Sequence, residues 1–212
     1  MSYIKNIARL LTEDPDVFRK NVVLAVHPNY VVDAVVFAST DKDYGPQRLQ
    51  MLKNYIDRFK RFIDGQISSG STVIITMIGD AMQLDTWYDP RNHYEDEGQV
   101  DPVKMGMEQE EVGSLHQDLK DYIHEKASLP NVYVVSERLA GDACRTGKLD
   151  DMLEGADELS VVGGHLTGCL SRTVEMLRKR PDGPEVSIIT ELTFDDDENF
   201  WKRASADYFN QS

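Results

Sequence analysis

Residues 161–174 read Val161-Val-Gly-Gly-His165-Leu-Thr-Gly-Cys169-Leu-Ser-Arg-Thr-Val174. A short run of apolar residues leads into a glycine-bearing turn, and the turn leads into a segment with helical spacing. This order is typical of a strand buried in a parallel sheet and followed by a helix that covers the sheet. We expect Cys169 to lie at the start of that helix.

The same alternation recurs along the whole chain. Short apolar runs rich in β-branched residues, the pattern of strands buried on both faces, occupy residues 21–26, 72–77, 131–135, 159–162 and 186–189. Segments of helical spacing separate them, at residues 49–63, 115–123, 149–153 and 169–178. The sequence therefore predicts an α/β fold, a three-layer αβα sandwich with a mostly parallel, doubly wound sheet.

The length of 212 residues predicts one domain, with a core of about residues 21–193 and a C-terminal tail at 194–212. Two segments fall outside the alternation. The acidic connection at 79–113 holds Trp87, Tyr88, His93 and Tyr94, and the tail is acidic and then aromatic. Connections of this length in compact domains are usually binding loops, lids or disordered segments.

Charge and cysteine content exclude several classes of protein. The formal net charge of −14 repels phosphate backbones and argues against a general nucleic-acid binder. Charged residues throughout 1–20 argue against a secretory signal, and the chain lacks an apolar run of roughly 18 residues that could span a membrane. Two cysteines are too few for a disulfide framework. We expect a cytoplasmic protein with reduced thiols.

The position of Cys169 suggests a chemical role. Unpaired N–H groups at the start of a helix favour a thiolate and can also hold an oxyanion. The alternative is that Cys169 is a small residue of the core.

The window around Cys169 resembles the nucleophile segment of the isochorismatase-like cysteine hydrolases, which include nicotinamidases and N-carbamoyl amidohydrolases. Gly163 and Cys169 keep the family's spacing of six residues, and Thr167 lies one place after the family's threonine. The resemblance covers roughly residues 21–193 and implies a Rossmann-like topology. It also places the turn that shapes the oxyanion hole at Gly164 and His165.

The triad that the resemblance implies is not conserved in this chain. The family uses an Asp to take the thiol proton, a Lys to support the charge, and the Cys as nucleophile. Here His27 stands at the position of the Asp, and Asn29 stands at that of a nearby Gln. At the position of the Lys, after the third predicted strand, the chain has Ser136, Glu137 and Arg138.

Each replacement has two interpretations. His27 can act as the base for Cys169, because Cys–His pairs are an established nucleophile arrangement, or it can be a strand-end histidine satisfied by backbone. Arg138 can supply the missing positive charge, or it can form a solvated loop pair with Glu137. We therefore take Cys169, His27 and Arg138 as candidate catalytic residues. Asn29, Gly164, His165 and Trp87 are the candidate substrate contacts.

We expect neither a metal nor another cofactor. Nicotinamidase-like members carry Asp-x-His and a later His after the second strand. The corresponding window here offers Asp80, Asp85, Asp89 and His93, without the paired histidine spacing.

The expected partners are a small-molecule substrate or ligand and further copies of the chain. The resemblance implies a dimer or tetramer, and the aromatic residues of the tail and of the Trp87 loop offer apolar surface for such an assembly. We expect no contact with nucleic acid or membrane.

Two functions remain open on the sequence. One is an isochorismatase-like hydrolase that acts on a small amide-like or ester-like substrate through Cys169 and His27. The other is a catalytically silent homologue that serves as a ligand-binding or protein-interaction module.

Overall fold

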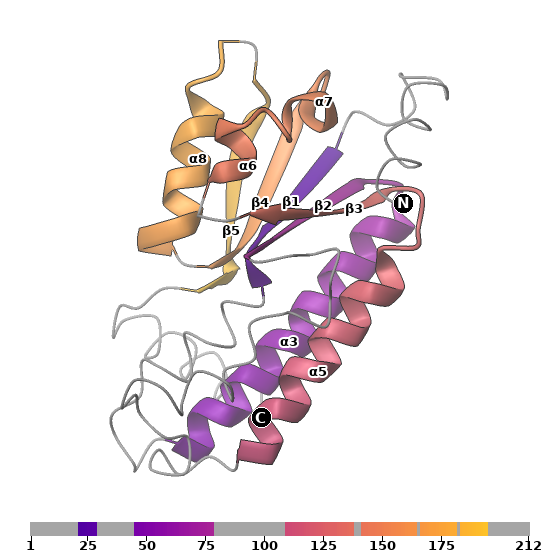
Figure 1. Ribbon diagram of the computed structural model, residues 1–212, viewed down its shortest axis with the longest axis vertical. Helices are drawn as coiled ribbons and strands as arrows, with labels where there is room; N and C mark the ends of the chain where they lie inside the picture. Colours follow the sequence, from indigo (N-terminus) through magenta and orange to yellow (C-terminus); the bar gives the residue numbers. More distant parts are fainter. Residues whose placement is uncertain are drawn as a thin grey trace.

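A computed structural model describes residues 21–28, 45–78, 109–137, 141–164, 166–181 and 183–194. Labels follow Figure 1. In chain order the elements are β1 Asn21–Val26, α3 Gly45–Ser68, β2 Thr72–Ile78, α5 Gln109–Lys126, β3 Val132–Glu137, α6 Asp142–Arg145, α7 Asp150–Leu153, β4 Glu158–Gly164, a π-helical turn Leu166–Leu170, α8 Ser171–Arg178 and β5 Glu185–Phe194.

The strands form a parallel sheet in the order β3-β2-β1-β4-β5. Helices α3 and α5 cover one face, and α6, α7 and α8 cover the other (Figure 1). The predicted three-layer α/β fold is confirmed within the part of the chain that the structure describes. The strand order reverses at β1: the chain adds β2 and β3 on one side of it and then β4 and β5 on the other.

The predicted boundaries were wrong at several strand ends. β3 continues through Ser136 and Glu137, which the sequence analysis placed in a loop. β4 continues through Gly164, and β5 reaches Phe194 after a register irregularity against β4. The short helix α6 was missed, because four residues carry no recognisable helical period.

The apolar stripe of α3 lies on the sheet as its spacing predicts. Leu52, Ile56, Phe59 and Ile63 are buried, and they pack with residues of β1 and β2 and with Leu119 of α5. A stripe spaced by three and four residues faces one side of a helix, so one face of α3 is apolar and the other is free for charges.

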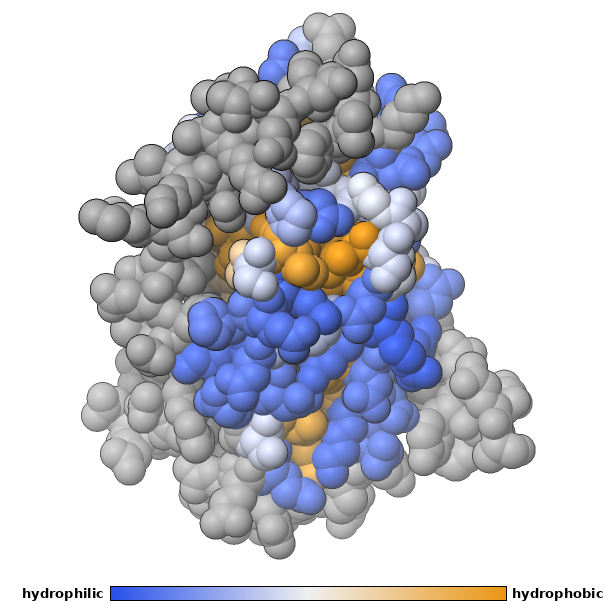
Figure 2. All heavy atoms as spheres, turned by 90° about the vertical axis from the view of Figure 1, so that its right-hand side faces the viewer, coloured by the Kyte–Doolittle hydropathy of each residue, from blue (hydrophilic) through white to orange (hydrophobic). Residues whose placement is uncertain are grey.

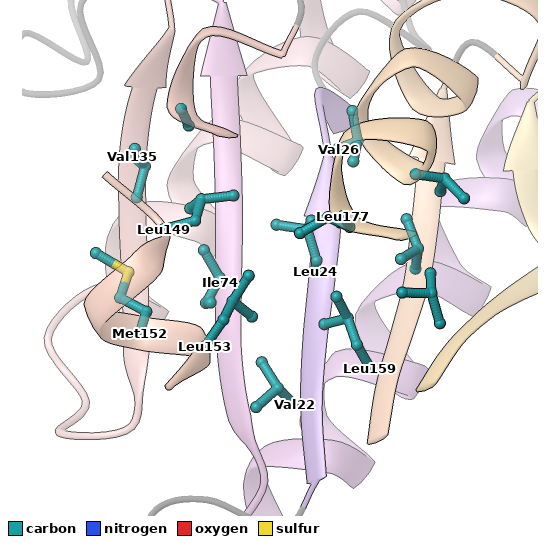
Figure 3. Close-up of a cluster of buried hydrophobic side chains, with 14 of the residues drawn as sticks. Val22, Leu24, Val26, Ile74, Val135, Leu149, Met152, Leu153, Leu159 and Leu177 are labelled. Atoms are coloured by element: carbon teal, nitrogen blue, oxygen red, sulfur yellow. The ribbon is translucent and has the colours of Figure 1, made fainter. Parts of the chain in front are cut away.

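The opposite face of the sheet has its own apolar cluster (Figure 3). Leu24 of β1 and Ile74 of β2 point toward Leu149, Leu153 and other residues of the covering helices. Both faces of the central strands are therefore buried, which is why their sequences are continuously apolar rather than alternating.

Helices α3 and α5 are also joined by polar contacts. Lys60 Nζ lies 2.6 Å from Asp118 Oδ2, and Lys126 Nζ lies 3.1 Å from Asp64 Oδ1. The Tyr122 hydroxyl donates to Asp64 Oδ1 at 3.0 Å and to the Lys60 carbonyl at 3.1 Å. The side of the molecule in Figure 2 is accordingly hydrophilic over most of its described surface.

We expect Tyr122→Phe to lower the free energy of unfolding by about 1 kcal/mol, because it removes a hydroxyl that donates to the half-exposed Asp64 carboxylate between α3 and α5. Urea denaturation measures the change. Tyr55→Phe is the matched control on the facing helix, because the buried Tyr55 hydroxyl has no hydrogen-bond partner among the described residues. Its loss should be neutral or stabilising, and an equal loss of stability in both variants would contradict the assignment.

Candidate functional site

The carboxyl ends of β1, β3 and β4 carry the residues of the site. His27 follows β1 directly and is fully buried. Its backbone N–H donates to the Thr76 carbonyl of β2 at 2.9 Å, so the residue is held against the sheet. In doubly wound sheets, ligands bind outside the carboxyl ends of the strands at the point where the order reverses, and β1 lies at that point here.

His27 has an unusual backbone conformation. Its φ is 46°, in the left-handed region that non-glycine residues seldom adopt, and Pro28 follows it. Alternation along β1 would direct its side chain to the α3 face, where Val23 and Ala25 lie. The left-handed conformation breaks the alternation and lets the ring reach a residue on the α6 side. Backbone strain of this kind is found preferentially at functional sites.

That residue is Glu137, the last residue of β3. Its Oε2 pairs with His27 Nε2, and its Oε1 accepts a 2.6 Å hydrogen bond from the backbone N–H of Ala143 in α6. Only 2% of Glu137 is exposed to solvent. The interpretation of Glu137 as part of a solvated loop pair is therefore wrong. Both carboxylate oxygens are engaged, and the carboxylate is fixed in place.

Cys169 is a second neighbour of the imidazole. It belongs to the π-helical turn that precedes α8, and its side chain is partly buried against the apolar cluster of the α6 side. The Cys169 side chain helps to raise the pKa of His27. Since Nε2 faces Glu137, the nitrogen available to the thiol is Nδ1. Nδ1 is buried and has no hydrogen-bond partner among the described residues, so the thiol lies near the ring without a formed hydrogen bond to it. Loose geometry is common in catalytic pairs without substrate.

Gly163 makes this approach possible. Its φ is 107°, and a Cβ built on it would lie 2.1 Å from the Val26 carbonyl oxygen. Gly163 and Val26 are paired across β4 and β1. Only glycine allows the end of β4 to run this close to the end of β1, and the turn that carries Cys169 begins there.

The protonation of His27 reflects these neighbours. Burial lowers the pKa of His27, but the neighbouring Cys169 and Glu137 side chains raise that pKa above its ordinary value overall. The charged imidazolium is thus favoured between a carboxylate and a thiol. The arrangement can hold a thiolate–imidazolium pair.

The second cysteine is in a different environment. Burial raises the pKa of the Cys144 thiol to about 11, which Glu137 and Asp150 reinforce and Arg180 opposes. A thiol with so high a pKa contains very little thiolate near neutral pH. Cys144 therefore serves as an internal reference for the reactivity of Cys169.

Other predicted site residues fall partly outside the described chain. Gly164 is buried at the end of β4 and pairs with Phe194 of β5. Asn29, Trp87, Arg138 and His165 lie outside the described residues, as do the candidate metal ligands Asp80, Asp85, Asp89 and His93. Within the described ranges, no group of three or more His, Cys, Asp or Glu side chains could hold a metal ion. No helix there is long and apolar enough to cross a membrane.

Glu137 is the functional candidate that the sequence analysis missed. A signal was present in the alternation of the third strand, because Tyr133 and Val135 face the α6 side and the next residue on that face is Glu137. When a carboxylate at the end of a strand falls on the same face as the buried residues before it, we expect it to be buried and paired with another polar group.

We expect the stability of the fold to depend on His27 and pH. Because the pKa of His27 is higher in the folded protein, its contribution is complete below the ordinary histidine pKa and is lost as pH rises through the folded pKa. The difference in unfolding free energy between the native chain and His27→Asn should therefore shrink from pH 6 to pH 9. Asparagine tolerates a positive φ, so it preserves the backbone.

Urea denaturation at a series of pH values gives this difference. His124→Asn, at an exposed position of α5, is the control and should not change the pH dependence. A difference in unfolding free energy between the native chain and His27→Asn that widens with rising pH would contradict the pairing of a protonated His27 with Glu137.

Comparisons with known proteins identify the same fold. No protein-family profile and no curated protein sequence matches the chain. Among solved structures, the pyrazinamidase/nicotinamidase from Streptococcus mutans UA159 superposes with a TM-score of 0.51 at 10% identity, over 88% of this chain and 93% of that chain.

Two other solved structures give lower scores. The nicotinamidase SaPncA from Staphylococcus aureus gives a TM-score of 0.45 at 14% identity, covering 90% of this chain and 92% of that chain. An isochorismatase-like hydrolase from Alkaliphilus metalliredigens gives 0.44 at 12% identity, covering 89% of each. The similarity to the Streptococcus mutans structure confirms the α/β fold that the sequence predicts.

Proposed function

We propose that this chain, which has the fold of the nicotinamidases and isochorismatase-like hydrolases, hydrolyses a small amide or ester through Cys169. The observation that carries the proposal is the buried His27–Glu137 pair, with the partly buried Cys169 near enough to raise the pKa of His27. A nucleophile, a base within reach of it and a third group that orients the base are the general requirements of nucleophilic catalysis.

The contacts assign one role to each residue. Glu137 accepts the Nε2–H of His27, which leaves Nδ1 unprotonated toward the thiol in the neutral ring. Nδ1 takes the proton of Cys169, and the thiolate attacks the carbonyl carbon of the substrate. The negative charge that develops on the carbonyl oxygen is held by backbone N–H groups of the helix start, where the first turn has no intrahelical partners.

His27 then returns its proton to the leaving amine or alcohol as the carbon–heteroatom bond breaks, and a thioester on Cys169 remains. Water, deprotonated by the same Nδ1, attacks this thioester and releases the carboxylic acid and the thiol. Throughout the cycle Glu137 stabilises the imidazolium and keeps the ring in one orientation.

The proposal inverts the polarity of the triad that the family resemblance implies. An acid is expected at position 27 and a base after the third strand, but the chain has a base in the first place and an acid in the second. The net charge of the pair is unchanged. The proton acceptor, His27, therefore remains at the end of β1. Its supporting partner, Glu137, is negatively charged, whereas the Lys of the family is positively charged.

The remaining functional assignments rest on sequence position. Arg138 follows Glu137 and is proposed to supply positive charge to the developing anion. Asn29, Gly164, His165 and Trp87 are proposed substrate contacts. A cytoplasmic homo-oligomer that acts on a small molecule stays part of the proposal.

Thiol alkylation tests the central pair. With iodoacetamide at pH 7, Cys169 should react at least about tenfold faster than Cys144, because burial keeps Cys144 protonated. His27→Asn should reduce the rate at Cys169 by about tenfold or more, and Cys144→Ser should leave it unchanged. Mass spectrometry of the two peptides gives both rates.

The same variants distinguish hydrolysis from a silent homologue. The native chain should hydrolyse p-nitrophenyl acetate, and Cys169→Ser should reduce turnover by at least about a thousandfold. A rate at Cys169 that does not depend on His27, together with no turnover, would overturn the hydrolase and favour a binding module.

Glu137→Gln should lower the turnover of the same ester about a hundredfold or more. Because the Ala143 N–H needs an acceptor, the glutamine oxygen faces Ala143 and its NH₂ group faces Nε2. The ring must then carry its proton on Nδ1, which is the wrong tautomer for accepting the thiol proton. Loss of the carboxylate charge should also lower the pKa of His27, so the pH–rate profile should change.

Glu125→Gln, at an exposed position of α5, is the matched control for this substitution. Circular dichroism checks that both variants are folded. If the two variants retained equal activity, Glu137 would not orient His27.

A further inference from the structure

One buried polar group near the site has no role in the mechanism above. The hydroxyl of Thr76 in β2 is buried, and it has no hydrogen-bond partner among the residues that the structure describes. Buried hydroxyls are nearly always paired in folded proteins, so an orphaned one requires an explanation.

The register of the sheet places Thr76 beside the His27–Glu137 pair. β2 lies between β1 and β3, and Thr76 is aligned with Val26 on one side and Val135 on the other. His27 follows Val26 directly at the end of β1, and Glu137 lies two residues after Val135 at the end of β3. Because these side chains come from β1 and β3, their contact spans the end of β2.

Thr76 also faces the same side of the sheet as Glu137. Ile74, two residues earlier, belongs to the apolar cluster of the α6 side, and alternation gives Thr76 the same face. Its backbone carbonyl accepts the N–H of His27 at 2.9 Å, which ties the strand to the site at this level. The register therefore places the Thr76 side chain on the face of the sheet where Glu137 lies, at the level of the strand ends that carry His27 and Glu137.

The apolar surroundings do not explain a threonine here. Val26, Ile74 and Val135 are its buried neighbours on this face, and valine has the same shape as threonine without the hydroxyl. The charged acceptor at this end of the sheet is Glu137.

We propose that Thr76 is a positioning residue of the triad, whose hydroxyl donates a hydrogen bond to the Glu137 carboxylate when that carboxylate faces a protonated His27. This inference rests on the proposed function. The donor holds Glu137 as an anion, and the anion in turn stabilises the imidazolium that Cys169 needs as its partner.

Other charged groups around Glu137 are unaffected by changes at Thr76. The Cys144 thiol lies near the carboxylate, and Asp150 and Arg180 lie near Cys144, where they form an ion pair. These groups belong to α6, α7 and the chain after α8, on the helix layer rather than on β2. A change confined to the Thr76 hydroxyl leaves them in place.

Thr76→Val and Thr76→Ser form the matched pair for the test. The rate of Cys169 alkylation by iodoacetamide is measured from pH 5 to pH 10, together with unfolding in urea. Thr76→Val should slow alkylation near neutral pH by about tenfold, the usual effect of removing a hydrogen bond to a charged group. Its unfolding free energy at neutral pH should be lower than that of the native chain, because the same hydrogen bond stabilises the charged His27–Glu137 pair in the folded state. Thr76→Ser should stay within about threefold of the native rate.

A double-mutant cycle with Glu137→Gln identifies the partner of the hydroxyl. Thr76→Val should add little to the Glu137→Gln variant, because the carboxylate is already gone. Equal slowing in both backgrounds would mean that Thr76 acts through packing, and it would overturn the proposal. A native rate in Thr76→Val would overturn it as well.

The failure of the proposed function has a separate signature. If the alkylation rate of Cys169 did not depend on His27, the proposed hydrolase activity would be refuted. The effect of Thr76 would still be measurable in the pH dependence of the unfolding free energy to which His27 contributes. In that case Thr76→Val should move this dependence to lower pH, and an unchanged dependence would refute the role of Thr76.

Discussion

The site depends on the close approach of two strands, β1 and β4. Gly163 lies so near the Val26 carbonyl that no side chain can be accommodated at its position. This contact brings the end of β4 beside the end of β1 at the point where the sheet reverses its winding. Cys169 and His27 are 142 positions apart in the chain by their numbering, yet they become neighbours because of this single packing constraint.

The chemistry of the site follows from which groups are buried together. A buried carboxylate without a partner is strongly disfavoured, and Glu137 avoids this by pairing with His27 and with the amide of Ala143. The imidazole in turn gains enough from Glu137 and Cys169 to offset the loss of water around its charged form. The charged form of His27 is thus stabilised by both of its neighbours, although the triad of the family resemblance is absent.

Much of the fold could be predicted from the sequence, because the two kinds of element have different patterns. Buried parallel strands are short, continuous apolar runs, and amphipathic helices have apolar residues spaced by three and four. The juxtaposition of His27 and Cys169 was also predictable, since both follow buried strands whose carboxyl ends share one edge. Glu137 was missed for a physical reason. Its burial depends on two more residues of β3 and on the amide of α6, a helix too short to leave a pattern. Thr76 was hidden as well, because a threonine in a strand is ordinary by composition.

The left-handed backbone at His27 has a consequence for how such a site can change during evolution. Aspartate and histidine both tolerate this conformation, so position 27 can exchange one for the other without altering the backbone. In the genetic code, His to Asp and Glu to Lys each require one nucleotide change. Either change alone would bury two carboxylates, or two bases, against each other, and one partner would be forced to give up its charge. Under the proposed function, the two polarities of the triad are therefore separated by two nucleotide changes and by an intermediate in which two like groups are buried together.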